Sequence, residues 1–203
     1  MCVGFLFAAE VALGWVRVSG TFETASARDS FGLCMLWDFL FHAAVSINEE
    51  VSMRGWLLLN TAHATAAHLG VAPAVAASLA VAAQSLVFAA MHLGSPGASR
   101  LGLLNLTIGG IAAALNVFLS GGLAFGLGWH FAWNYTMGNL LGMSTSGIPI
   151  SATLVSIVPH PLKAARHGGR FGPESSPLAP IAYLLGCALL VGWYGTRGLD
   201  GRS

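Results

Sequence analysis

Two adjacent carboxylates in an otherwise apolar region are the first residues that could do chemistry. Glu49 and Glu50 follow the apolar run 31–47, and Arg54 comes four residues after Glu50. On a helix, Glu50 and Arg54 share one face with the acid nearer the N-terminus, which is the favourable order for an ion pair. Glu49 points to another side and has no partner along the helix, and an unpartnered carboxylate among apolar groups suits a general base. The alternative is an ion pair at a helix end with no chemical role.

Two further motifs place polar side chains in apolar stretches. His92 follows Phe88 by four residues, and Asn134 follows His130 by four residues. His130 and Asn134 share a helix face, so they could stabilise an oxyanion together. Each motif has a structural alternative: a solvated histidine at the membrane interface, or hydrogen bonds between helices. Together with a free carboxylate, they could activate a water and hold a tetrahedral intermediate.

The composition indicates that apolar helices position these residues. Of the 203 residues, 55% are hydrophobic and 8% are charged, and the mean hydropathy is +0.71. Soluble domains carry about 25% charged residues, so this chain could not cover its surface with polar groups in water. The net charge of +1 gives no polyanion-binding signature, so nucleic acid is not an expected partner. We predict an all-α, polytopic transmembrane helix bundle.

Five or six spans are predicted, because a span needs about 20 apolar residues. The candidates are 1–16, 31–59, 73–94, 101–119, 123–142 and 178–195. The segment 148–158 is apolar but too short to cross, so we expect it to be re-entrant or interfacial. We expect one integral-membrane domain over 1–203, with a motif-bearing core at 31–142 and a first span truncated at its start. A signal peptide is the alternative for that first segment.

A polar stripe precedes the two carboxylates on the same predicted helix. Asp38, His42 and Ser46 stand four residues apart, and Glu49 follows three residues later. Asp38 and His42 either pair with each other or line a water path, and we favour a structural or access role.

Other polar residues are expected to have no catalytic role. His160 and His167 stand beside a basic patch and are expected to be exposed. Three asparagines are expected to join helices by hydrogen bonds: Asn105, Asn116 and Asn139.

The three motifs, in their order along the chain, resemble those of the CPBP family of CAAX prenyl endopeptidases and bacteriocin-processing membrane proteases. The family pattern is Glu-Glu-x-x-x-Arg, then Phe-x-x-x-His, then His-x-x-x-Asn, and the resemblance covers roughly residues 31–142. Gly172-Pro-Glu174 also looks like a segment of bacterial members. The resemblance implies an intramembrane endopeptidase in which Glu50 and Arg54 brace the site.

The resemblance also implies the catalytic roles. Glu49 and His92 would position the attacking water, and His130 and Asn134 would stabilise the oxyanion. Straight helices would leave His92 at a different depth from Glu49 and His130, with an offset of roughly 15 Å. A helix must therefore be tilted, be broken or start later than this division of the spans implies. Two glycines and a proline within 94–97 would allow an unwound segment just after His92.

A zinc ion is the open alternative, because members of the family have also been described as metalloproteases. Glu49, His92 and His130 form a plausible zinc set with a fourth position for water. We favour the metal-free mechanism, because His130 and Asn134 aim two donors at one point, as an oxyanion needs, and no acid lies near either histidine in the sequence to orient it toward a metal. Glu50 could still orient a histidine from another helix. The expected partners are a membrane-associated protein or peptide substrate and lipid. The expected location is the bacterial inner membrane.

Two other functions stay open at this point. One is a catalytically silent binding or immunity protein of the same fold. The other is a proton-coupled transporter that uses the carboxylates and histidines as a relay. The sequence has no internal repeat of the kind that would favour transport. It also lacks His-Glu-x-x-His, Gly-x-Ser-Gly and Gly-x-Gly-Asp, so other intramembrane protease chemistries fit poorly.

Overall fold

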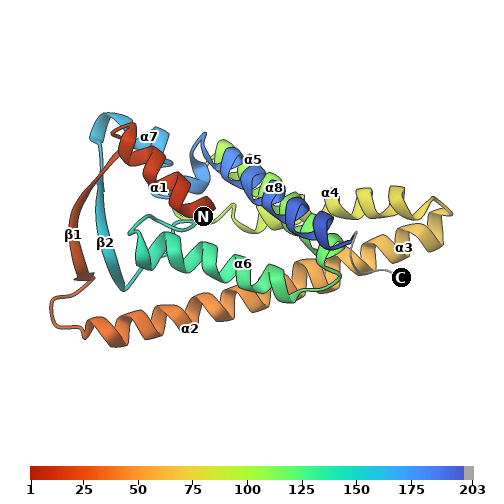
Figure 1. The fold of residues 1–203 in the computed structure, drawn as a ribbon, viewed down its shortest axis with the longest axis horizontal. Helices are drawn as coiled ribbons and strands as arrows, with labels where there is room; N and C mark the ends of the chain where they lie inside the picture. Colours follow the sequence, from red (N-terminus) through yellow and green to blue (C-terminus); the bar gives the residue numbers. More distant parts are fainter. Residues whose placement is uncertain (199–203) are drawn as a thin grey trace.

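The computed structural model describes residues 1–198 and shows a bundle of apolar helices with a two-stranded ribbon at one end (Figure 1). The helices are α1 (Cys2–Ala12), α2 (Phe31–Glu49), α3 (Leu59–Leu69), α4 (Pro73–Met91), α5 (Arg100–Ser120), α6 (Ala124–Tyr135), α7 (Ala164–His167) and α8 (Ala179–Gly198). Two π-helical segments, Glu50–Leu58 and Thr136–Leu140, continue α2 and α6. Short 3-10 turns form at Pro161–Lys163 and Pro173–Ser175. The predicted helical membrane bundle is confirmed.

One helix of 39 residues, Phe31–Leu69, runs along the whole molecule (Figure 1). It joins α2, the first π-helical segment and α3 without a break. Gly70 ends it in the left-handed conformation, with φ +61°, and Pro73 then starts α4 at a position where its missing N–H is not needed. At about 1.5 Å per residue the helix is about 58 Å long, well beyond the roughly 30 Å of a bilayer core.

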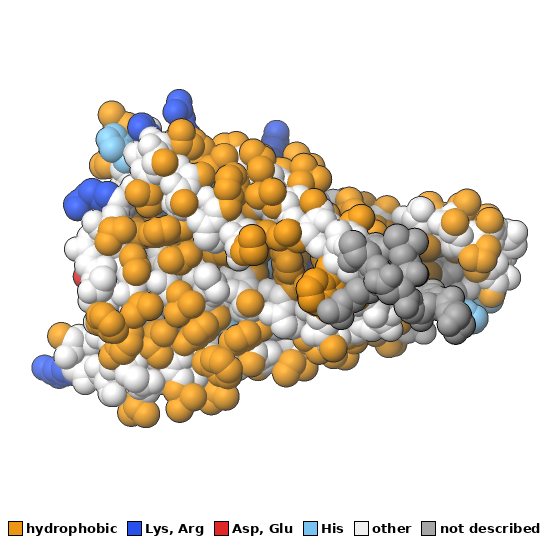
Figure 2. Space-filling model, in the orientation of Figure 1, with side chains coloured by type: hydrophobic (Ala, Val, Ile, Leu, Met, Phe, Trp, Pro, Cys, Tyr) orange, Lys and Arg blue, Asp and Glu red, His pale blue; other side chains and the backbone are white. Residues whose placement is uncertain are grey.

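Within residues 1–198, three helices are long and apolar enough to cross a membrane: Phe31–Leu69, Pro73–Met91 and Arg100–Ser120. The helices at the first and last predicted spans are shorter, since the apolar helical stretches there are Cys2–Ala12 and Ala179–Tyr194. Large apolar side chains are exposed over the bundle, whereas Lys and Arg gather near the ribbon end (Figure 2). Trp37 and Trp56, for example, are each 66% exposed. This surface suits lipid and not water.

The segment expected to be re-entrant or interfacial is a β-strand over most of its length, so it does not re-enter the membrane as a helix. Strand β2 (Ala152–Pro159) pairs antiparallel with β1 (Val16–Thr24), from Val16 opposite Pro159 to Thr24 opposite Ala152. The prediction for 148–158 rested only on the length of its apolar run. The β-branched residues of 153–158 favour an extended strand, and the partner strand lies between the predicted spans 1–16 and 31–59.

A buried ion pair holds the ribbon end to the C-terminal third of the chain. Glu10 Oε2 lies 2.6 Å from His167 Nδ1, and the two residues are 0% and 2% exposed. The expectation that His167 is exposed is therefore wrong, because its partner lies 157 residues away and could not be identified from the local sequence.

We expect His167→Ala to lower the melting temperature of the protein in detergent. The change leaves Glu10 buried without its partner, which costs about 3–5 kcal/mol in comparable buried pairs. The matched control is His63→Ala, since His63 is exposed on α3. Equal melting temperatures for the two variants would show that the pair does not stabilise the fold.

Candidate active site

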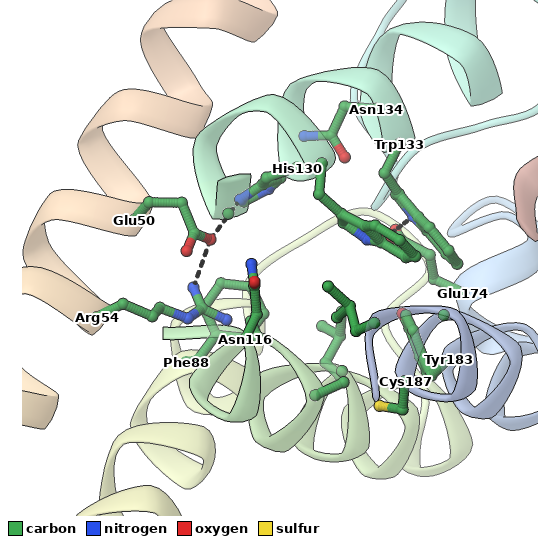
Figure 3. Close-up of a pocket in the computed structure, with 18 residues that line it drawn as sticks. Glu50, Arg54, Phe88, Asn116, His130, Trp133, Asn134, Glu174, Tyr183 and Cys187 are labelled. Carbon is green, nitrogen blue, oxygen red and sulfur yellow. Dashed lines mark hydrogen bonds and ion pairs between the residues drawn. The ribbon is translucent and has the colours of Figure 1, made fainter. Parts of the chain in front are cut away.

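Glu50, Arg54 and His130 meet where the π-helical segment after α2 approaches α6 (Figure 3). Glu50 Oε1 lies 3.1 Å from an Arg54 Nη atom and 2.9 Å from His130 Nδ1. Glu50 and Arg54 are each 1% exposed. The ion pair expected along the helix is present, and the histidine 80 residues later shares the same carboxylate oxygen.

Glu49 approaches the other ring nitrogen of His130. Its Oε2 lies 3.6 Å from His130 Nε2, and the two side chains are 16% and 15% exposed. Within residues 1–198, the Glu49 side chain thus has no hydrogen bond along its own helix, but it has an ion-pair partner on α6, His130. His130 stands between two carboxylates, one buried and neutralised by Arg54, the other more open.

The helix changes from α to π next to the first motif and next to the third motif. The helix becomes π-helical at Glu50 and stays so to Leu58, and the second π-helical segment starts one residue after Tyr135. π-Helical segments are rare and occur frequently at functional sites, because the wider turn redirects side chains. Here the first segment begins within the first motif, and the second begins just after the third motif, so both lie next to the contact between these motifs.

Phe88 connects His92 to the rest of the cluster. Its ring lies 5.1 Å from the His92 ring and 6.5 Å from the His130 ring, and the Arg54 guanidinium sits 4.3 Å from its centre. The aromatic residue of the second motif is therefore a platform shared by a cation and two imidazoles.

The helix that carries the second motif, α4, ends next to His92. α4 ends at Met91 and turns follow, which is the unwound segment that the glycines and the proline after His92 allow. His92 Nδ1 lies 2.9 Å from the Phe88 carbonyl oxygen. Within residues 1–198, no hydrogen bond or ion pair joins His92 to Glu49 or His130. The structure brings His92 to the same aromatic ring, but not into contact with the general base expected from the resemblance.

A cavity lies beside Glu50, between the helices that carry the first and third motifs and α5 and α8 (Figure 3). At its polar end are Glu50, Arg54, Asn116, His130 and Asn134. Its other walls are mainly apolar and come from α5, α6 and α8, including Leu106, Trp129, Tyr183, Cys187 and Leu190. Asn134 is 5% exposed and shares this cavity with His130, as their four-residue spacing predicted.

Glu174 is a buried part of the site region that the sequence indicated only weakly. Its Oε1 accepts a hydrogen bond from Trp133 Nε1 at 3.2 Å, and its Oε2 accepts from the Ser146 amide at 2.8 Å. The Asn105 amide donates to the Glu174 carbonyl oxygen at 2.9 Å. The Gly172-Pro-Glu174 segment thus ties the last connection to α5 and α6. Among the described residues, Asn105 joins α5 to this connection and not, as had been expected, to another membrane helix.

A zinc ion at Glu49, His92 and His130 would need donor atoms of all three side chains to point at one position. Within residues 1–198, no three His, Cys, Asp or Glu side chains lie together as a metal site. Both ring nitrogens of His130 face carboxylates, and His92 Nδ1 faces a backbone carbonyl. The arrangement does not fit the zinc set of Glu49, His92 and His130, so no catalytic step is derived through a metal.

We expect Gly126→Ala to impair the site, although alanine favours a helix over glycine by about 1 kcal/mol. A Cβ at Gly126 would stand 3.2 Å from Glu50 Oε2 and 3.3 Å from Asn116 Nδ2, so both groups would have to shift. Gly128 lies on the same helix with nothing within 4 Å of such a Cβ. Gly128→Ala should therefore raise the melting temperature without loss of activity, whereas Gly126→Ala should lose activity. Identical behaviour of the two variants would contradict tight packing around Glu50.

An apolar helix bundle with ionisable side chains buried between its helices defines an integral membrane protein with a polar internal site. A family model described as Type II CAAX prenyl endopeptidase Rce1-like matches residues 31–136. The match covers just over half of the chain, so the chain belongs to this family of intramembrane CAAX proteases. Searches of curated proteins and of solved structures gave no match.

Proposed function

We propose that the protein is an intramembrane endopeptidase in which Glu49 and His92 activate the attacking water. His130 and Asn134 stabilise the oxyanion, and the Glu50–Arg54 pair fixes His130. The observation that carries the proposal is the position of His130 between the two carboxylates, with Arg54 on the inner one.

Charge balance supports this division of roles. His130 donates from Nδ1 to Glu50 and from Nε2 toward the reaction site only when both nitrogens are protonated. In that form its positive charge and that of Arg54 balance the two carboxylates. A neutral cluster avoids the cost of an uncompensated charge among apolar helices.

The catalytic steps follow from these positions. Glu49, the more exposed carboxylate, takes a proton from a water held between it and His92. The oxygen of the water attacks the scissile carbonyl carbon, and the His130 and Asn134 donors receive the negative charge on the carbonyl oxygen. Glu49 then returns the proton to the leaving amine. His92 needs to approach Glu49 for the first step, and the turns that follow His92 allow that movement.

The substrate class follows from the family, which acts on membrane-associated peptides or proteins. The apolar walls of the cavity support a substrate that reaches the site from the lipid. We further propose the bacterial inner membrane as the location, which the resemblance of Gly172-Pro-Glu174 to bacterial members supports.

The test compares membrane peptides from cells that express the wild-type protein with those from cells that express Glu49→Ala. We expect peptides that appear only with the wild type and share a cleavage position. If both samples hold the same peptides, although both proteins are in the membrane, the protein is a silent binding protein of this fold.

We expect purified, active protein to carry no stoichiometric zinc, because the donor atoms do not converge on a metal position. Elemental analysis of protein with measured activity checks this. If a chelator removes stoichiometric zinc with loss of activity, and added zinc restores it, the glutamate mechanism has to be abandoned.

A further inference from the structure

Several buried polar atoms along one face of α2 have no hydrogen-bond partner among the described residues. They are His42 Nδ1, His42 Nε2, Ser46 Oγ and Glu50 Oε2, in side chains of residues no more than 1% exposed. Asn139 Oδ1, from the π-helical segment that follows α6, also lacks a partner within hydrogen-bond geometry, and its side chain lies beside the His42 ring. Buried polar groups in native proteins nearly always find a partner, in the protein or in ordered water. Their grouping on one helix face therefore needs an explanation.

The spacing of these groups matches single water molecules. Asp38, His42, Ser46 and Glu50 follow each other at four-residue intervals, so successive positions are about 6 Å apart along the helix axis. One water with two hydrogen bonds of about 2.8 Å bridges such a gap. Serine in a helix commonly bonds the carbonyl four residues earlier, but Ser46 does not, and its hydroxyl is left for another partner.

Both ends of this row are built into polar structure. At one end, Asp38 Oδ2 accepts hydrogen bonds from Asn139 Nδ2 at 2.6 Å and from the Ser151 amide at 2.9 Å, next to the β-ribbon. At the other end is Glu50, which holds His130. His42 lies between, with Asp38 and His130 within electrostatic reach of its ring and the side chain of Asn139 beside it. The row thus leads from the ribbon end, where charged residues gather, to the proposed active site.

We propose that a file of ordered waters runs along the α2–α6 interface past His42 and Ser46, and supplies the water that proteolysis consumes. Each hydrolysis uses one water, and a site between apolar helices needs a polar route by which that water is replaced. The helices α2 and α6 pack side by side along this route (Figure 1). The supply role rests on the proposed protease function, whereas the waters themselves do not.

The waters are tested without any substrate by X-ray hydroxyl-radical footprinting of the protein in lipid nanodiscs. Radicals formed from a bound water oxidise the side chain beside it, so a wet residue is modified even when it is buried. We expect oxidation of His42, which is 0% exposed, and protection of Met137, which is 0% exposed in an apolar cluster. Ser46→Val should abolish the oxidation of His42. The matched control Ala44→Val, at an exposed position of the same helix, should retain it.

The supply role is tested with a peptide substrate from the membrane-peptide comparison. Ser46→Val should lower kcat by about tenfold, the effect of one lost hydrogen bond on the water path, with KM and melting temperature unchanged. Ala44→Val should match the wild type. Protection of His42 equal to that of Met137, after correction for their intrinsic reactivities, would overturn the proposal. A labelled His42 with unchanged kcat in Ser46→Val would leave the waters but remove their supply role. Absence of any proteolysis, with His42 still labelled, would count against the proposed function alone.

Discussion

Glu49→Gln is expected to abolish proteolysis while the protein remains in the membrane. Glutamine keeps the shape of the side chain and its approach to His130, but it cannot take a proton from water. Loss of a general base lowers turnover by about 10²–10⁴-fold. The measurement is the rate of cleavage of a co-expressed reporter, together with the amount of protein in the membrane fraction.

The matched control for this change is Glu23→Gln, since Glu23 is an exposed carboxylate on β1. It should cleave at the wild-type rate. Near-normal turnover in Glu49→Gln would remove Glu49 as the base and leave Glu50 as the carboxylate to consider.

The second large effect concerns the fold. Glu50→Ala and Arg54→Ala should both lower the melting temperature in detergent, because each leaves a buried charge without its partner, at a cost of about 3–5 kcal/mol. Glu50→Ala should be the more damaging, since Glu50 serves both Arg54 and His130. In Arg54→Ala the carboxylate keeps the histidine. Thermal unfolding of the purified variants measures the difference.

Arg28→Ala removes an exposed arginine and should leave the melting temperature unchanged. If Glu50→Ala and Arg54→Ala were as stable as the wild type and yet inactive, the pair would take part in the chemistry. The division between a supporting carboxylate and a catalytic one would then be wrong.

Local geometry explains why the first motif could be interpreted from the sequence. The Glu50–Arg54 pair depends on four residues of helix, and the helix is there. The positions of the helices also agreed with the apolar stretches. The unwound segment after His92 followed from the glycines and the proline beside it.

Contacts between distant segments could not be predicted in the same way. The shared oxygen of Glu50 joins residues 80 positions apart, and the Glu10–His167 pair joins residues 157 positions apart. No local pattern marks either contact. Strand β2 was missed because its apolar length resembled a membrane segment, and the strand became recognisable only beside its partner.

The β-ribbon fixes the order in which the protein is completed during synthesis. β1 ends at Thr24 and its partner begins at Ala152, so the helices α2 to α6 leave the ribosome in between. At roughly 5–20 residues per second this interval lasts about 6–26 s. During that time β1 has unpaired backbone groups, which the hydrocarbon core cannot accommodate, so it has to wait in polar surroundings. The helices that carry the active site are therefore inserted before the ribbon and the Glu10–His167 pair can close. A segment that is made late, 152–167, then secures one that is made early, 10–24.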